Sequence, residues 1–329
     1  MLRRILTALI ISALIIVPFF GHAQPIRISY GGTSGFGTPL LLTLQMGLFK
    51  KHGIDLEHIL MPGMGVQALL AREVQFAHPG AAPAIYAALQ GADVVMVASY
   101  YNVLPYSLVV HENIVNPLDL KGKKVAISRV GGIDDFSVQL AFKKLGLAPK
   151  DTALIQVGAD AERIAAVRSG AAAATVNAPP AVFTAQKLGL KVLVDLGELD
   201  IPYPIGVVVT TRSYLSENRA TAKRFLMALV EGLDIYVYEK DVALSVMAKL
   251  TRMRDQDLLS KSYDYFAKGM SLVPLLNPTA VENALLGAGA SGRDVGKFYD
   301  NSVLQELVKE GFIDRIAKNR IAKKRSGGS

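Results

Sequence analysis

The chain of 329 residues contains no cysteine. This absence excludes disulfide scaffolds, thiolate metal sites, iron–sulfur clusters and cysteine nucleophiles together. Tryptophan is also absent, and five histidines are spread over the sequence. Hydrophobic residues make up 51% of the chain and charged residues 19%, so it can build a large core and is not a disordered polymer. At about 150 residues per domain, the length predicts about two domains.

The net charge of +8 comes from the two ends of the chain. Eight of the 36 basic residues lie there, which leaves equal numbers of basic and acidic residues, 28 each, in the body. A basic groove that follows nucleic-acid phosphates is therefore not supported. Residues 316–329 are expected to form a flexible basic tail, and contact of this tail with anionic lipid headgroups or a permease is the alternative. The terminal basic residues are Arg3, Arg4, Arg315, Lys318, Arg320, Lys323, Lys324 and Arg325.

The first 23 residues have the pattern of a secretory signal peptide. A basic start precedes a largely apolar run of sixteen residues (5–20), and Gly21-His22-Ala23 places small residues before a cleavage site. The apolar run is shorter than the roughly 20 residues of a membrane span, so a retained anchor is the weaker alternative. We expect cleavage before Gln24 and a periplasmic location.

Strand-like and helix-like segments alternate in the remaining chain, which predicts βαβ units and mostly parallel sheets. Strand Ile26–Tyr30, a glycine-rich turn at 31–37 and a helix at 38–46 begin this series. A polar connector around residues 116–124 separates two such runs, an apolar strand at 205–211 crosses back, and helices follow from 218. These features predict lobe 1 (24–114 and 206–315) and lobe 2 (115–205), joined by a two-segment hinge, with a ligand between them.

Several segments carry a family resemblance: IRISYGGTSGFGTPLLLTLQMGLFKKHGIDLE, DLKGKKVAISRVGGIDDFSVQLAFKKLGL and ERIAAVRSGAAAATVNAPP. The chain resembles the ABC-transporter substrate-binding proteins of the sulfonate/nitrate/taurine type, a family that includes binders of thiamine pyrimidine precursors. The resemblance implies an α/β, type II periplasmic binding fold with a helical C-terminal part. It also implies a monomer that binds an organic anion or heteroaromatic solute and delivers it to an ABC permease in the inner membrane, without cofactor, metal or nucleic acid.

An enzyme is the alternative, because a eukaryotic branch of this superfamily makes a thiamine pyrimidine and depends on a Cys-rich motif. This chain has no cysteine, and it contains neither H-E-x-x-H nor G-x-S-x-G. The histidines lie in unrelated elements, so no catalytic set is indicated. The sequence therefore favours a binding protein over an enzyme.

Two strand-to-helix loops of lobe 1 supply candidate ligand contacts. With the family pattern, Ser34 and Gly35 are expected to contact the ligand and Phe36 to form a wall, since glycines and free amides at a helix start suit an anionic oxygen. A plain turn is the alternative. In the second loop, His78 replaces a small residue typical of the family, and it either donates to the ligand or has a structural role. Gly80 and Ala81 of this loop complete the lobe 1 candidates.

Arg129 is the main candidate in lobe 2, because a guanidinium holds a carboxylate or sulfonate through paired N–H bonds. Ser128 and Asp135 lie in the same loop. Asp134 and Asp135 cap the following helix start, and a salt bridge between Arg129 and one of them is an equally weighted alternative.

Four further candidates follow predicted strands or lie at the hinge. Tyr101 and Asn102 supply an aromatic wall and an amide, with core packing as the alternative. Asn177 offers an amide for orienting the ligand, next to prolines that fit a helix start. Tyr203 is expected to stack on the ligand, with stiffening of the hinge as its alternative.

Overall fold

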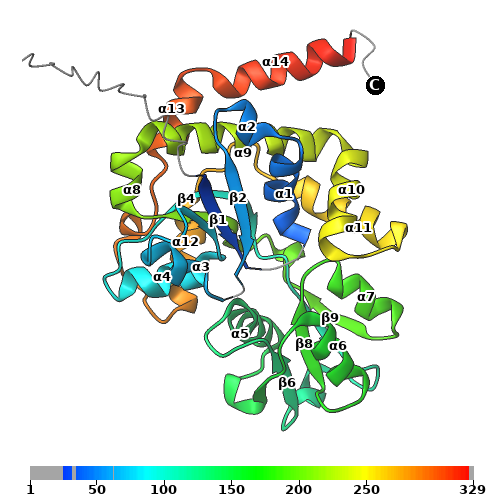
Figure 1. Cartoon of the computed structure of the whole chain (residues 1–329). Helices are drawn as coiled ribbons and strands as arrows, with labels where there is room; N and C mark the ends of the chain where they lie inside the picture. The colour runs from blue at the N-terminus through cyan, green and yellow to red at the C-terminus, as the bar shows by residue number, and fades with distance from the viewer. Residues whose placement is uncertain (1–24, 32–34, 62, 326–329) are drawn as a thin grey trace, which may run out of the picture.

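The computed structural model describes residues 25–31, 35–61 and 63–325. The predicted leader and Ser34 lie outside the described residues. Within the described part, no helix combines the length and the apolar character needed to cross a membrane. Two α/β lobes lie one above the other in Figure 1, and we keep the names lobe 1 for the upper and lobe 2 for the lower.

Lobe 1 is built on a five-stranded sheet in the order β2-β1-β3-β10-β4. β1 pairs in parallel with both β2 and β3, as expected for βαβ units, whereas β10 runs antiparallel to β3 and β4. The strands are β1 (Ile26–Tyr30), β2 (Leu56–Leu60), β3 (Phe76–His78), β4 (Val95–Val103) and β10 (Pro202–Thr210).

Lobe 2 repeats this arrangement with the order β7-β6-β8-β5-β9. β6 is parallel to β7 and β8, and β5 is antiparallel to β8 and β9. In each lobe, therefore, the strand that runs antiparallel to its neighbours is the first strand along the chain after it enters from the other lobe. The strands are β5 (Ser107–Val110), β6 (Lys124–Ile127), β7 (Ala153–Gln156), β8 (Ala174–Asn177) and β9 (Lys191–Asp195).

The chain crosses between the lobes at residues 104–106 and 196–201, earlier than the boundaries 114/115 and 205/206 expected from the sequence. β5 causes the larger difference, because it belongs to the lobe 2 sheet although it precedes the polar connector. Its apolar side chains are equally compatible with either sheet, so the local sequence does not show which one it joins.

Helices cover both sheets, and most of them belong to lobe 1. Those before the first crossing are α1 (Thr38–Gln45), α2 (Leu48–Lys51), α3 (Gly65–Leu70) and α4 (Ala81–Leu89). Lobe 2 contains α5 (Ile133–Leu145), α6 (Asp160–Arg168) and α7 (Ala181–Lys187). The helical C-terminal part returns to lobe 1 as α8 (Arg212–Glu217), α9 (Arg219–Tyr238), α10 (Lys240–Thr251), α11 (Gln256–Gly269), α12 (Pro278–Gly287), α13 (Ser302–Lys309) and α14 (Phe312–Arg325).

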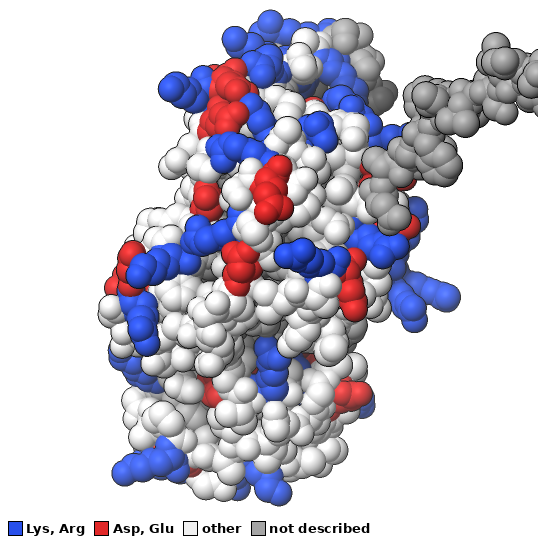
Figure 2. All heavy atoms as spheres, turned by 60° about the vertical axis from the view of Figure 1, so that its left-hand side comes forward, with Lys and Arg blue, Asp and Glu red and all other residues white. Residues whose placement is uncertain are grey.

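The predicted flexible tail is wrong for residues 316–325, because they continue helix α14. The cause is packing: Phe312 is buried, and Arg320 forms an ion pair with Asp234 of α9. A composition rich in cations does not reveal such contacts. Figure 2 shows Lys and Arg side chains gathered at the upper end of the molecule, where α14 lies in Figure 1.

Candidate functional site

A cavity of about 560 Å³ lies between the lobes and is lined by both. Its walls come from the loops that follow β1, β2 and β3 in lobe 1 and β6 and β7 in lobe 2, together with the start of β10. The carboxyl ends of the parallel strands in both lobes therefore meet at one space, which is where open α/β sheets bind ligands.

The first turn of α4 opens onto this cavity in lobe 1. Gly80 precedes the helix with a φ of 82°, which favours glycine, and it offers no side chain to cap the helix. The backbone N–H groups of Ala81 and Ala82 therefore have no partner within the helix, and both residues line the cavity. The positive end of the helix dipole adds to their attraction for an anion.

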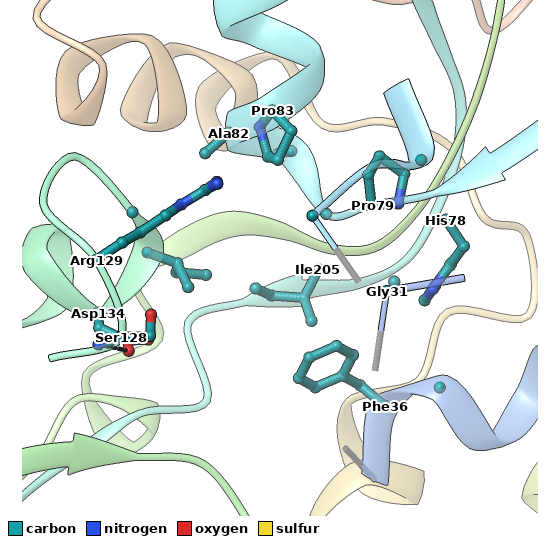
Figure 3. A pocket seen from close by; sticks show the side chains of 18 of the residues that line it. Gly31, Phe36, His78, Pro79, Ala82, Pro83, Ser128, Arg129, Asp134 and Ile205 are labelled. Carbon is teal, nitrogen blue, oxygen red and sulfur yellow. Dashed lines mark hydrogen bonds between the residues drawn. The ribbon is translucent and has the colours of Figure 1, made fainter. Parts of the chain in front are cut away.

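Arg129 approaches the same place from lobe 2. Figure 3 shows its side chain extending toward Ala82 and Pro83 at the start of α4. The residue is exposed, and within the described residues its guanidinium forms neither an ion pair nor a hydrogen bond. An uncapped helix start and an unpaired cation thus lie on opposite sides of one cavity.

The alternative that Arg129 pairs with an aspartate is wrong, because both carboxylates have other partners. Asp134 accepts a hydrogen bond from the Ser128 amide at 2.9 Å, and its Oδ2 lies 3.4 Å from Nη1 of Arg163. Asp135 accepts from the amide of Gly131 at 2.8 Å and from the side chain of Gln139 at 2.8 Å. These bonds hold the loop between β6 and α5 and leave Arg129 free.

A charged cluster centred on Arg163, which the sequence does not predict, lines the lobe 2 side of the cavity. The Arg163 side chain is 4% exposed, and its Nη2 lies 2.5 Å from Oδ1 of Asp160. Asn177 donates to the same Asp160 oxygen at 2.9 Å. Asp160 is only partly buried, and its partial desolvation raises its pKa, while the charge of Arg163 and the hydrogen bond from Asn177 oppose that rise in part. Asp134, Asp160 and Arg163 all line the cavity.

His78 lies in the wall of lobe 1 and is held by a tyrosine. The Tyr100 hydroxyl donates to the backbone oxygen of Phe36 at 2.9 Å, so its oxygen accepts from Nε2 of His78, which lies 2.6 Å away. Burial, together with the smaller effect of His58, lowers the pKa of His78 to about 4. At neutral pH the imidazole is therefore uncharged and offers hydrogen bonding without a charge.

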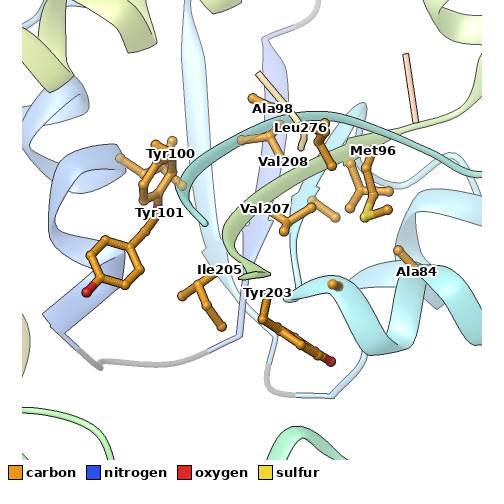
Figure 4. Close-up of a cluster of buried hydrophobic side chains, with 14 of the residues drawn as sticks. Ala84, Met96, Ala98, Tyr100, Tyr101, Tyr203, Ile205, Val207, Val208 and Leu276 are labelled. Atoms are coloured by element: carbon orange, nitrogen blue, oxygen red, sulfur yellow. The ribbon is translucent and has the colours of Figure 1, made fainter. Parts of the chain in front are cut away.

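Apolar side chains complete the cavity. Phe36, Tyr203 and Ile205 line it, and Figure 4 shows Tyr203 and Ile205 at one end of the buried cluster that fills lobe 1. The Tyr203 ring lies 5.2 Å from that of Phe136 in α5, so it also joins the two lobes. Burial raises the pKa of Tyr203, which keeps its hydroxyl protonated at physiological pH.

The structure brings seven of the thirteen residues predicted from the sequence to this cavity: Phe36, His78, Gly80, Ala81, Ser128, Arg129 and Tyr203. Contact of these residues with a ligand stays a prediction. Ser34 lies outside the described residues. Other residues that line the cavity were not among the candidates from the sequence, for example Met61, Tyr106, Asp160 and Arg163.

The other five predicted residues lie outside the lining of the cavity. A Cβ on Gly35 would lie 2.8 Å from the Phe266 ring, so Gly35 permits close packing rather than facing the cavity. The Tyr101 ring also packs on Phe266, and the Asn102 amide donates to the backbone oxygens of two neighbours, Ser99 and Leu275. These contacts correspond to the packing alternative. As described above, Asp135 stabilises its own loop and Asn177 orients Asp160.

Among the described residues, no group of three or more His, Asp or Glu side chains is placed to hold a metal ion. The cavity is lined by amide, guanidinium, carboxylate, imidazole and aromatic groups. Together they form a mixed polar and apolar binding site at the carboxyl ends of two sheets.

Two lobes of this topology, with a cavity at the strand ends between them, define the periplasmic binding protein fold of type II, as the sequence resemblance implied. The family model described as NMT1/THI5 like matches residues 37–242, more than half of the chain. The chain belongs to the NMT1/THI5-like family. Among curated proteins, no sequence matches it significantly.

Solved structures support the same fold. A periplasmic sulfonate-binding protein, SsuA, from Methylobacillus flagellatus is 19% identical with a TM-score of 0.71, covering 87% of this chain and 94% of its own. The periplasmic aliphatic sulphonate binding protein SsuA from Escherichia coli is 22% identical with a TM-score of 0.64, covering 74% and 84%. The desulfurization enzyme DszB is 14% identical with a TM-score of 0.68, covering 87% and 99%. The fold thus serves both binding proteins and an enzyme.

Proposed function

We propose that this chain is the periplasmic solute-binding component of an ABC importer. It captures a small organic anion between its lobes and delivers it to a permease in the inner membrane. The observation that carries this proposal is the unpaired Arg129, which faces the uncapped start of α4 across the cavity. Membership of the NMT1/THI5-like family and the likeness to sulfonate-binding proteins support the transport role.

An anionic head group fits between these two features. A charge-assisted hydrogen bond contributes about 1.5–3 kcal/mol, and a helix start adds about 0.3–1 kcal/mol to the binding of a negative charge. Phe36, Tyr203 and Ile205 provide apolar surface for the rest of the solute. The cavity of about 560 Å³ is within the usual size range for sites of small organic ligands.

Asp160 adds a requirement for a hydrogen-bond donor. Its Oδ1 is used by Arg163 and Asn177, while its side chain remains 47% exposed and lines the cavity. A donor group on the solute, or a water that the solute retains, satisfies the remaining carboxylate oxygen. The preferred solute therefore combines an anionic end with an apolar body and a polar donor.

Contacts between the lobes flank the cavity and favour a closed arrangement around the solute. The Tyr86 hydroxyl of α4 donates to the backbone oxygen of Gly131 in lobe 2 at 2.9 Å. Lys187 of α7 lies 2.5 Å from a carboxylate oxygen of Asp255 at the start of α11. A solute that touches both walls binds this arrangement more tightly than one in which the lobes separate, and the permease then recognises the closed form.

A thermal-shift panel with recovery of the solute tests the proposal. Alkanesulfonates, aromatic carboxylates and their neutral amide or alcohol analogues are added to the mature chain beginning at Gln24. A solute at about 100 times its Kd adds about 2.7 kcal/mol, which for a chain of this size raises Tm by about 4 °C. We expect an anion to give this shift and to be recovered unchanged by mass spectrometry. Conversion of the bound compound would favour an enzyme, the function that the likeness to DszB suggests.

A further inference from the structure

Helix α14 is held to the molecule by only part of its surface. Arg320 pairs with Asp234 of α9, and its guanidinium lies 3.4 Å from the centre of the Tyr238 ring. Lys323 is 4.0 Å from a carboxylate oxygen of Glu239. With the buried Phe312, these contacts define the inner side of the helix, and they use two of its cations.

The outer side of α14 presents a different set of residues. Lys318, Ile321, Ala322 and Arg325 follow the spacing i, i+3, i+4, i+7, which places them on one face, and all four are exposed around a shallow hollow. Neither Lys318 nor Arg325 has an ion pair or hydrogen bond within the described residues. Ile321, between them, is 47% exposed.

We propose that this outer face of α14 binds the surface of a membrane that contains anionic phospholipids. Cations flanking apolar side chains are the pattern of a helix that lies in the interface, where cations meet headgroups and apolar side chains enter the acyl boundary. An acidic protein surface would satisfy the two cations but would leave Ile321 and Ala322 without a reason to be exposed. The charge of the face therefore complements lipid phosphates, and its apolar centre favours lipid over protein.

The position of α14 permits such docking while the solute site remains accessible. The helix lies at the end of lobe 1 that is remote from lobe 2, and the cavity lies between the lobes (Figure 1). Figure 2 shows Lys and Arg side chains at this end of the molecule, with Asp and Glu side chains among them. Binding at this face would hold the chain at a membrane without covering the cavity.

Vesicle co-sedimentation of the mature full-length chain tests this proposal. The vesicles contain either equal parts of phosphatidylglycerol and phosphatidylcholine or phosphatidylcholine alone. Each cation near an anionic surface contributes about fivefold to binding, so Lys318→Gln with Arg325→Gln is expected to weaken binding to the anionic vesicles about 25-fold. The control, Lys143→Gln with Lys144→Gln, changes the charge equally on an exposed part of α5 and is expected to bind as the wild type does.

A third variant separates insertion from charge. Ile321→Ser keeps every charge and is expected to weaken binding to anionic vesicles, because it removes the apolar side chain that enters the bilayer. In a separate measurement, 0.5 M salt is expected to weaken the binding of the wild type to these vesicles by screening its charges. Circular dichroism and Tm confirm that the exposed substitutions leave the fold intact. The proposal would be overturned if the wild type failed to bind anionic vesicles, or if the α14 and control double variants bound them equally. It would also be overturned if the chain bound a permease in detergent without any dependence on lipid.

Discussion

Replacing Arg129 by glutamine isolates the charge that we place against the anionic end of the solute. The guanidinium has no partner among the described residues, so its loss is expected to change stability by less than about 0.5 kcal/mol. Its effect on binding comes from charge-assisted hydrogen bonds, whose range is about 1.5–3 kcal/mol. Because Arg129 is exposed to solvent, the lower end applies, which corresponds to about a tenfold loss of affinity.

Isothermal titration calorimetry with an anionic solute and its neutral analogue measures this loss. Arg168→Gln is the matched control, because Arg168 is an exposed cation of α6 outside the lining of the cavity. We expect the affinity for the anion to fall about tenfold in Arg129→Gln and to stay unchanged in the control. An equal loss for the anion and the neutral analogue, or no loss at all, would refute the role of Arg129.

Three further substitutions test the walls of the site. Arg163→Met leaves Asp134 and Asp160 without their buried partner and is expected to lower the free energy of unfolding by about 3–5 kcal/mol in urea; an unchanged midpoint would contradict the cluster. The pKa of His78 is about 4 in the folded state and 6.5 in the unfolded state, so the unfolded state binds the proton first as the pH drops. The free energy of unfolding is therefore expected to fall by about 3 kcal/mol between pH 6.5 and pH 4. His78→Gln is expected to remove this pH dependence, which unfolding in urea at several pH values measures. Gly206→Ala forces a side chain onto a φ of 66° and into the Tyr100 ring, so a loss of at least about 2 kcal/mol in the free energy of unfolding is expected. A Tm equal to that of the wild type would exclude this strain.

The sequence predicted local elements better than it predicted how they assemble. Strand β1 has the predicted bounds, Ile26–Tyr30, because a glycine-rich turn ends its run of strand-forming residues. β5 precedes the polar connector in the chain, but the sheet it joins depends on pairing with β8 and β9, far along the chain. α14 was missed because its stability comes from packing on α9, which the cation-rich composition hides.

The candidate site was predicted only where a loop at the end of a strand carried a conspicuous residue. Arg129 and His78 were found in this way, and the structure places both at the cavity. Asp160 also follows a strand, and the same rule applied after β7 would have selected it. Arg163 gave no signal, since its burial depends on Asp134 from another loop, and long-range charge pairing of this kind is not visible in local sequence.

The central claim is that a solute holds the two lobes together around the cavity, and a distance measurement between the lobes tests it directly. Since the chain has no native cysteine, Gln67→Cys on α3 and Lys144→Cys on α5 provide two specific sites for spin labels, one in each lobe. Double electron–electron resonance is recorded without solute and with a solute whose binding calorimetry has established. We predict a broad distribution without solute and a single narrower, shorter one at saturation. Identical distributions in the two states would contradict closure of the lobes on the solute.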